Sequence, residues 1–92
     1  MRLVAILLAL LPAAAAALEI NAASRAQLEQ LQGLGVAMTE RVIQARAERP
    51  FADWRDLEAR VAGIRGRRAE QLHRQGVTVN GKPLPGGHGD SR

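Results

Sequence analysis

A short pattern occurs twice in this chain, thirty residues apart, and it constrains the fold more than any other feature. The first copy runs from Leu31 to Gly35 and the second from Val61 to Arg65, and each is followed by a helix-forming stretch. Both copies contain an apolar residue, a spacer, a glycine and a second apolar residue, which predicts a tight turn that leads into a helix. A duplicated turn of this kind predicts a domain of two similar halves.

The residues around the turns predict a helix on each side of each turn. Ser24 and Gln27 form a capping box before the first helix, Pro50 closes the second, and Asp53 caps the third. Gly76 ends the fourth as a C-terminal cap. The predicted helices are residues 25–31, 36–48, 54–60 and 67–75. Packed through their apolar faces, the halves give an all-α, pseudo-two-fold four-helix domain with both glycine turns on one surface.

The first seventeen residues have the pattern of a secretory signal peptide. Met1-Arg2 is followed by an apolar run from 3 to 11, then by Pro12 and the small residues 13–17. We expect cleavage between Ala17 and Leu18. The alternative is an uncleaved membrane anchor, but the uncharged stretch 3–18 has 16 residues, whereas a spanning helix needs about 20.

The predicted organisation is therefore a signal peptide over 1–17, a domain over 18–79 and a disordered tail over 80–92, which is rich in glycine and proline. The chain has no cysteine, so helix packing alone must stabilise the domain. An export signal without cysteine fits a compact domain in the bacterial periplasm.

Positive charge is concentrated in the second half of the predicted domain. Residues 60–76 carry five arginines against one acidic residue, whereas residues 18–59 carry five basic and seven acidic residues. The five arginines are Arg60, Arg65, Arg67, Arg68 and Arg74. Such a cluster favours a polyanionic partner, and the forked guanidinium suits phosphate. An ordinary solvated face, or the codon usage of a GC-rich genome, would also explain the arginines.

The order and spacing of these pieces resemble a tandem helix-hairpin-helix, and more narrowly the ComEA family of competence DNA receptors. The resemblance covers about residues 19–79. It rests on Ile20 to Ser24 before Leu28, on the turn from Leu31 to Gly35, on Pro50-Phe51 before Asp56-Leu57, and on Val61 to Ile64. It implies a periplasmic protein that binds incoming double-stranded DNA without sequence preference for natural transformation. Components of a competence channel or pilus would be its partners.

The two turns and the charges beside them are the predicted DNA-binding site. Free backbone N–H groups at a helix N-terminus favour phosphate, and two turns related by a pseudo-dyad can each grip one strand. The predicted site residues are Gly33, Leu34, Gly35, Val36, Gly63, Ile64, Arg65, Gly66, Arg67 and Arg68. Leu34 and Ile64 are expected to anchor the turns by packing inward, and the three arginines to contact phosphate.

Two positions depart from the family pattern. Arg65 stands where the second turn should have its second glycine, so either the turn is rebuilt around Gly66 or Arg65 takes a positive φ. Met38 stands where a lysine or a similar polar residue is frequent. The first turn therefore keeps its geometry but lacks charge, and the second has charge with altered geometry.

The sequence gives little support for other classes of function. There is no nucleophile with a base, no paired carboxylates and no nucleotide-binding loop, so we expect no catalysis and no small-molecule substrate. His73 and His88 lack partner ligands, so no metal site is expected. No cofactor is expected either, although the resemblance allows a monovalent cation on the turn carbonyls. The remaining alternative is a protein–protein interaction module of the cell envelope.

Overall fold

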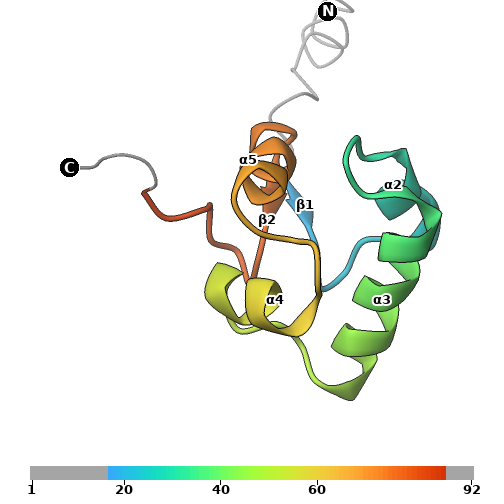
Figure 1. Cartoon of the computed structure of the whole chain (residues 1–92). Helices are drawn as coiled ribbons and strands as arrows, with labels where there is room; N and C mark the ends of the chain where they lie inside the picture. Colours follow the sequence, from blue (N-terminus) through green and yellow to red (C-terminus); the bar gives the residue numbers. More distant parts are fainter. Residues whose placement is uncertain (1–16, 87–92) are drawn as a thin grey trace, which may run out of the picture.

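The computed structural model describes residues 17–86, which form four helices and one pair of short strands (Figure 1). The elements are β1 (Leu18–Glu19), α2 (Arg25–Gln30), α3 (Gly35–Glu48), α4 (Trp54–Arg60), α5 (Arg67–Arg74) and β2 (Val77–Thr78). The predicted all-α class is confirmed. None of the helices within residues 17–86 is long and apolar enough to cross a membrane. Residues 1–16 of the predicted signal peptide and residues 87–92, with His88, lie outside the described residues.

The helix boundaries follow the predicted caps. The Ser24 hydroxyl accepts a hydrogen bond from the Gln27 N–H at 3.0 Å, and the Gln27 side chain accepts one from the Ser24 N–H at 2.9 Å, which completes the capping box. The Asp53 carboxylate caps α4 by accepting from the Asp56 N–H at 2.8 Å. α3 ends at Glu48, just before Pro50, as expected for a helix that meets a proline.

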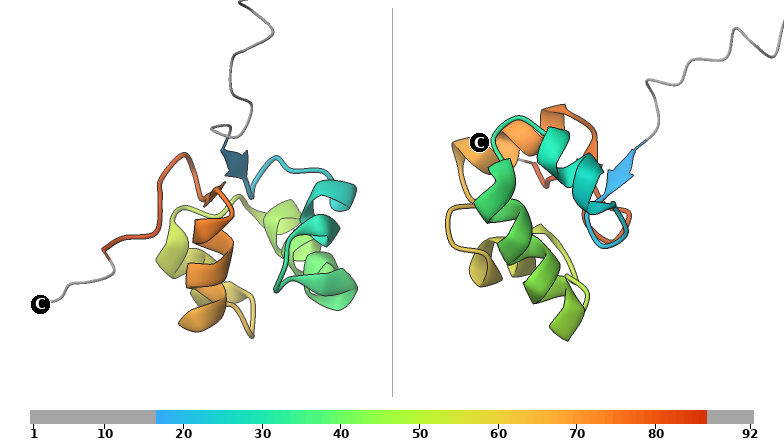
Figure 2. Two further views of the ribbon diagram at one scale, coloured as in Figure 1. Left: turned by 90° about the horizontal axis from the view of Figure 1, so that it is seen from above. Right: turned by 90° about the vertical axis from the view of Figure 1, so that its right-hand side faces the viewer.

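The two helix-turn-helix halves lie side by side and share one core (Figure 2). Each half contributes buried side chains, among them Ile20, Leu28, Leu34 and Val42 from the first and Trp54, Leu57, Val61, Ile64 and Leu72 from the second. Phe51, in the connection between α3 and α4, is buried as well. Its backbone N–H and carbonyl both bond to the Asn21 side chain, at 2.7 and 3.0 Å, so Phe51 joins the connection to the first half.

A parallel strand pair ties the ends of the domain together. β1 and β2 pair in the register Leu18 with Val77 and Glu19 with Thr78. The sequence does not predict this pairing. Two-residue strands carry no alternation of apolar and polar residues, and their pairing joins residues far apart in the chain. Figure 1 shows the pair between the two helical halves.

The Glu19 carboxylate closes this junction. It accepts hydrogen bonds from the Thr78 hydroxyl at 2.9 Å and from the N–H groups of Asn21, Asn80 and Gly81 at 3.2, 2.8 and 2.7 Å. Partial burial acts to raise the pKa of Glu19, but these hydrogen bonds outweigh it and lower the pKa below its ordinary value. The ionised carboxylate therefore stabilises the folded state.

Stability should depend on pH through Glu19. Because its folded pKa is depressed, its contribution is complete above the ordinary Glu value of about 4.3 and is lost as pH falls through the lower folded pKa. We expect E19Q to lower the free energy of unfolding at pH 7 by about 1–2 kcal/mol. Urea unfolding across pH measures this, and the difference between the two proteins should shrink in acid. A difference that is constant from pH 7 to pH 3 would contradict this role for the charge.

Residues 80–84, which the sequence predicts as the start of a disordered tail, lie against the second half. The Trp54 indole N–H donates to the Lys82 carbonyl at 3.0 Å, and Leu84 packs on the core. The His73 ring contacts the Trp54 ring edge-on, with centroids 6.4 Å apart. The single tryptophan is therefore a core residue that also holds the segment after β2.

Candidate nucleic-acid interface

Glycines with positive φ build both turns. Gly33 and Gly35 have φ of +90° and +73° in the first turn, and Gly63 and Gly66 have +99° and +55° in the second. Among residues 17–86, Asn80 alone has a positive φ without being glycine. Arg65 therefore avoids the left-handed region, and the second turn is rebuilt around Gly66. As a result α5 begins at Arg67, two residues later than the position equivalent to the start of α3.

The helices that follow the turns begin without a side-chain cap. Leu34 and Gly66 are the N-cap residues of α3 and α5, and neither makes a side-chain cap hydrogen bond. The first N–H groups of a helix have no partner inside it, and the helix dipole favours an anion there. By contrast, α2 and α4 are capped by Ser24 and Asp53. The uncapped ends are thus confined to the two hairpins.

Both uncapped ends face the same side of the molecule. In the left view of Figure 2, the N-terminal ends of α3 and α5 lie on the side opposite β1. Leu34 and Ile64 are buried beneath the turns, as their predicted anchoring role requires. Val36 is 68% exposed at the start of α3. Arg65 and Arg67 are exposed beside the second turn.

Arg68 has a different position from its two neighbours. It is only partly exposed, and its Nη1 donates a hydrogen bond to the Gly33 carbonyl of the first turn. The resemblance allows a monovalent cation on the turn carbonyls. The carbonyl of Gly33, however, already accepts a hydrogen bond from the positively charged Arg68 side chain. The Gly33 carbonyl therefore does not fit a cation in this arrangement. The structure thus separates Arg68 from the exposed pair Arg65 and Arg67.

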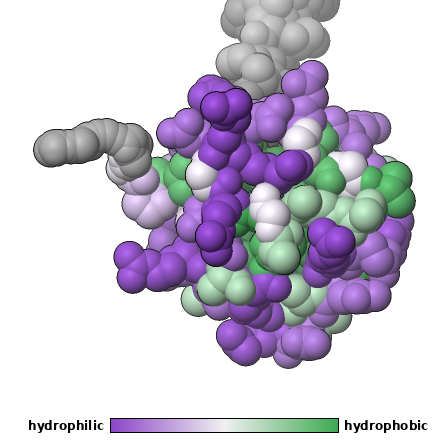
Figure 3. Space-filling model, viewed as in Figure 1, coloured by the Kyte–Doolittle hydropathy of each residue, from purple (hydrophilic) through white to green (hydrophobic). Residues whose placement is uncertain are grey.

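Two more members of the arginine cluster are engaged within the domain. The Arg60 guanidinium donates to the Ala45 and Arg49 carbonyls at 2.7 and 2.9 Å, and it lies 4.7 Å from the centre of the Phe51 ring. Arg74 lies 3.9 Å from the Glu70 carboxylate on α5. The local excess of positive charge is therefore carried outward mainly by Arg65 and Arg67. Figure 3 shows strongly hydrophilic side chains gathered over α5 on this face.

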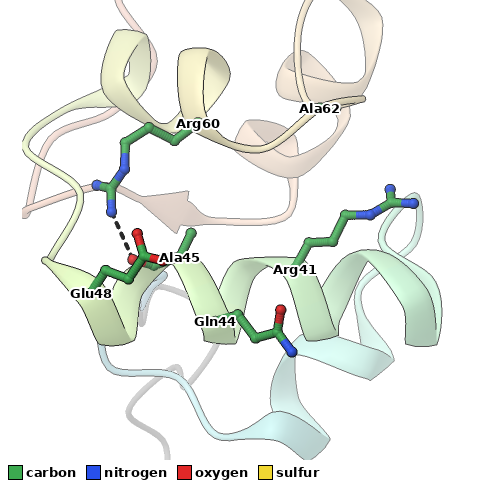
Figure 4. Close-up of a pocket in the computed structure, with 6 residues that line it drawn as sticks. All are labelled: Arg41, Gln44, Ala45, Glu48, Arg60 and Ala62. Atoms are coloured by element: carbon green, nitrogen blue, oxygen red, sulfur yellow. Dashed lines mark hydrogen bonds between the residues drawn. The ribbon is translucent and has the colours of Figure 1, made fainter.

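Arg41 of α3 is a positively charged residue near the second turn. The predicted site does not include it. A hollow of about 450 Å³ is lined by Arg41, Gln44, Ala45 and Glu48 of α3, by Arg60, and by Ala62 of the second turn (Figure 4). Arg41 is exposed on α3 and lines this hollow together with Ala62 of the second turn. Arg41 is equivalent to Gln71 in the thirty-residue repeat, and Gln71 lies against Gly33 of the first turn.

Glu40 of α3 and Glu70 of α5, at equivalent positions of the two halves, are each paired with an arginine. The Glu40 carboxylate accepts a hydrogen bond from the Arg25 guanidinium at 2.6 Å. The hydrogen bond and charge of Arg25 lower the pKa of Glu40. Within residues 17–86, no group of three or more His, Cys, Asp or Glu side chains could hold a metal ion. The side that carries the turns thus offers backbone N–H groups and arginines, which together suit a phosphate backbone.

Comparison with known proteins identifies the motif. The family model of the helix-hairpin-helix motif matches residues 14–75, which is more than half of the chain. Searches of curated proteins and of solved structures gave no match. The motif is a binding module and indicates nucleic-acid binding in general. Its match spans both glycine turns, so this chain belongs to the helix-hairpin-helix family.

Proposed function

We propose that this protein binds double-stranded DNA without sequence preference, through both hairpin turns at once. The observation that carries the proposal is the contrast between capped and uncapped helices. α2 and α4 satisfy their first N–H groups with Ser24 and Asp53, whereas α3 and α5 begin without a side-chain cap on one side of the domain. Two phosphates, one on each strand, would satisfy those groups.

A duplex suits this site better than a single strand does. Proteins that bind single strands without sequence preference stack bases on aromatic side chains. Here Trp54 and Phe51, the only aromatic residues of the chain, are each 1% exposed and belong to the core. Backbone N–H groups and arginines at the turns contact phosphate and sugar, which supply affinity with little sequence information. Binding of this kind suits DNA of arbitrary sequence.

We further propose that the protein is exported to the periplasm and receives DNA for natural transformation. The pattern of residues 1–17 and the resemblance to the ComEA family support this. Expression of the full chain in a Gram-negative bacterium, followed by fractionation and N-terminal sequencing, tests the export. The expected result is a periplasmic protein that begins at Leu18. Recovery of an intact chain that begins at Met1 would contradict it.

The DNA-binding proposal is tested by fluorescence anisotropy of a labelled random duplex across a salt series, with the processed protein. We expect micromolar affinity at low salt and a log–log slope of about −0.9 for each phosphate contacted, with roughly two to four contacts. A single strand of the same length should bind more weakly. The absence of binding at low salt would overturn the proposal. A protein–protein module of the cell envelope, docking through the exposed Val36, would then be the better account.

A further inference from the structure

The two turns are held by each other's helices. Met38 of α3 packs against Gly63, since its Cε lies 2.9 Å from where a Cβ on that glycine would stand. Arg68 of α5 is equivalent to Met38 in the thirty-residue repeat, and it donates a hydrogen bond to the carbonyl of Gly33. The same position in each half therefore supports the turn glycine of the other half, once through an apolar contact and once through a charged hydrogen bond.

Further contacts hold the first turn against α5. The Gln32 N–H donates to the Gln75 side chain at 2.9 Å, and the Gln75 side chain donates back to the Gln32 carbonyl at 2.8 Å. The Gln71 side chain lies against Gly33. Gln32 and Gln75 are exposed, and their bonds compete with water, whereas Arg68 is partly buried. The Arg68 guanidinium is also a charged donor, and hydrogen bonds from charged donors are stronger than those between neutral groups.

From these contacts we infer that Arg68 is a positioning residue of the DNA interface, which holds the first hairpin turn at a set distance from the second and does not itself contact phosphate. A duplex presents its two backbones at a fixed separation, so two turns can bind both only if their spacing is held. This positioning role depends on the proposed function, whereas the hydrogen bond between Arg68 and the Gly33 carbonyl does not.

The test compares R68M and R68K with R67Q, which alters an exposed arginine next in the chain. Met is chosen because it already occupies the equivalent position, at Met38. We expect R68M to bind duplex roughly ten-fold more weakly at every salt concentration, with the salt slope of the unaltered protein. R67Q should make the log–log salt slope less negative by about 0.9, because one phosphate contact is lost. R68K retains a charged donor and should recover part of the affinity.

A second readout needs no DNA. In the NMR spectrum of the free protein, the carbonyl carbon of Gly33 should shift upfield in R68M, because it loses a charged hydrogen-bond donor, and stay in place in R67Q. If the unaltered protein binds no duplex, the proposed function fails while this shift still tests the bond. If the log–log salt slope of R68M differed from that of the unaltered protein by an amount closer to 0.9 than to zero, the positioning role would be overturned. Unchanged affinity, or an unmoved Gly33 carbon, would overturn it too. If R68M does not fold, R68L, which also lacks a hydrogen-bond donor at this position, decides by the same criteria.

Discussion

Replacement of both Arg65 and Arg67 by glutamine should weaken duplex binding by roughly 100-fold at low salt, or about ten-fold for each arginine. These two arginines are exposed beside the uncapped start of α5. The slope of log affinity against log salt concentration should become less negative by about 1.8, because two phosphate contacts are lost. Fluorescence anisotropy on the same labelled duplex measures both quantities, and the affinities of the variant and the unaltered protein should converge at high salt.

The matched control is R55Q. Arg55 is also exposed, but it lies on α4 outside both turns, and its loss lowers the net charge by one. R55Q should change affinity by less than about three-fold, the size of a non-contacting surface charge effect. If R55Q and single replacements of Arg65 or Arg67 weakened binding equally, the interaction would depend on overall charge, and the assignment of the second turn would be wrong.

Replacement of Arg60 by methionine should destabilise the domain by roughly 2–4 kcal/mol with little direct effect on DNA contacts. Its side chain is 15% exposed and donates to two carbonyls at the end of α3, Ala45 and Arg49. Methionine keeps packing against Phe51 but leaves those carbonyls without their charged donor and removes the cation–π contact. Urea unfolding measures the loss as a lower midpoint at an unchanged slope.

The control for this variant is R55M on the same helix. An exposed arginine without these partners should contribute within about 0.5 kcal/mol of zero. If R60M proved as stable as R55M, Arg60 would not join the two halves. If R60M kept its stability but lost duplex affinity, Arg60 would belong to the DNA interface, contrary to its hydrogen bonds with the end of α3.

Much of the fold could be predicted from the sequence because its signals are local. A capping box at Ser24, a proline after α3 and a cap at Asp53 each act within one turn of helix, and the structure has all three. The repeat predicted the pairing of the halves, because two similar helix-turn-helix units must bury similar apolar faces. The sequence leaves two conformations open for the second turn, and the structure adopts the one in which Gly66 takes the positive φ, at +55°, and Arg65 does not.

Long-range contacts were the part that could not be predicted. The strand pair joins Leu18 with Val77 across the whole domain, and nothing in either dipeptide indicates a partner. The arginine cluster likewise reads as one charged group in the sequence. The structure divides it, because Arg60 and Arg68 reach carbonyls of the first half while Arg65 and Arg67 remain exposed. Which carbonyl an arginine reaches depends on tertiary packing.

The division of the arginines makes the two turns chemically unequal. The first turn leads into an uncapped helix start beside the exposed Val36, and the second into one beside Arg65 and Arg67. We expect the second turn to supply most of the salt-dependent affinity, since that term follows the number of neutralised phosphates. The first turn then contributes mainly backbone hydrogen bonds and apolar contact with sugars.

The most direct test of the whole account is an NMR titration of the ¹⁵N-labelled protein with a short random duplex. The account predicts that the backbone amides at the two uncapped helix starts shift most, Gly35 and Val36 in the first turn and Gly66 and Arg67 in the second. Amides of α2 and α4, whose N-termini are capped, should move little. Shifts confined to one turn would contradict binding by both hairpins. Shifts centred on α4, or none at all, would contradict the use of the uncapped helix ends for DNA.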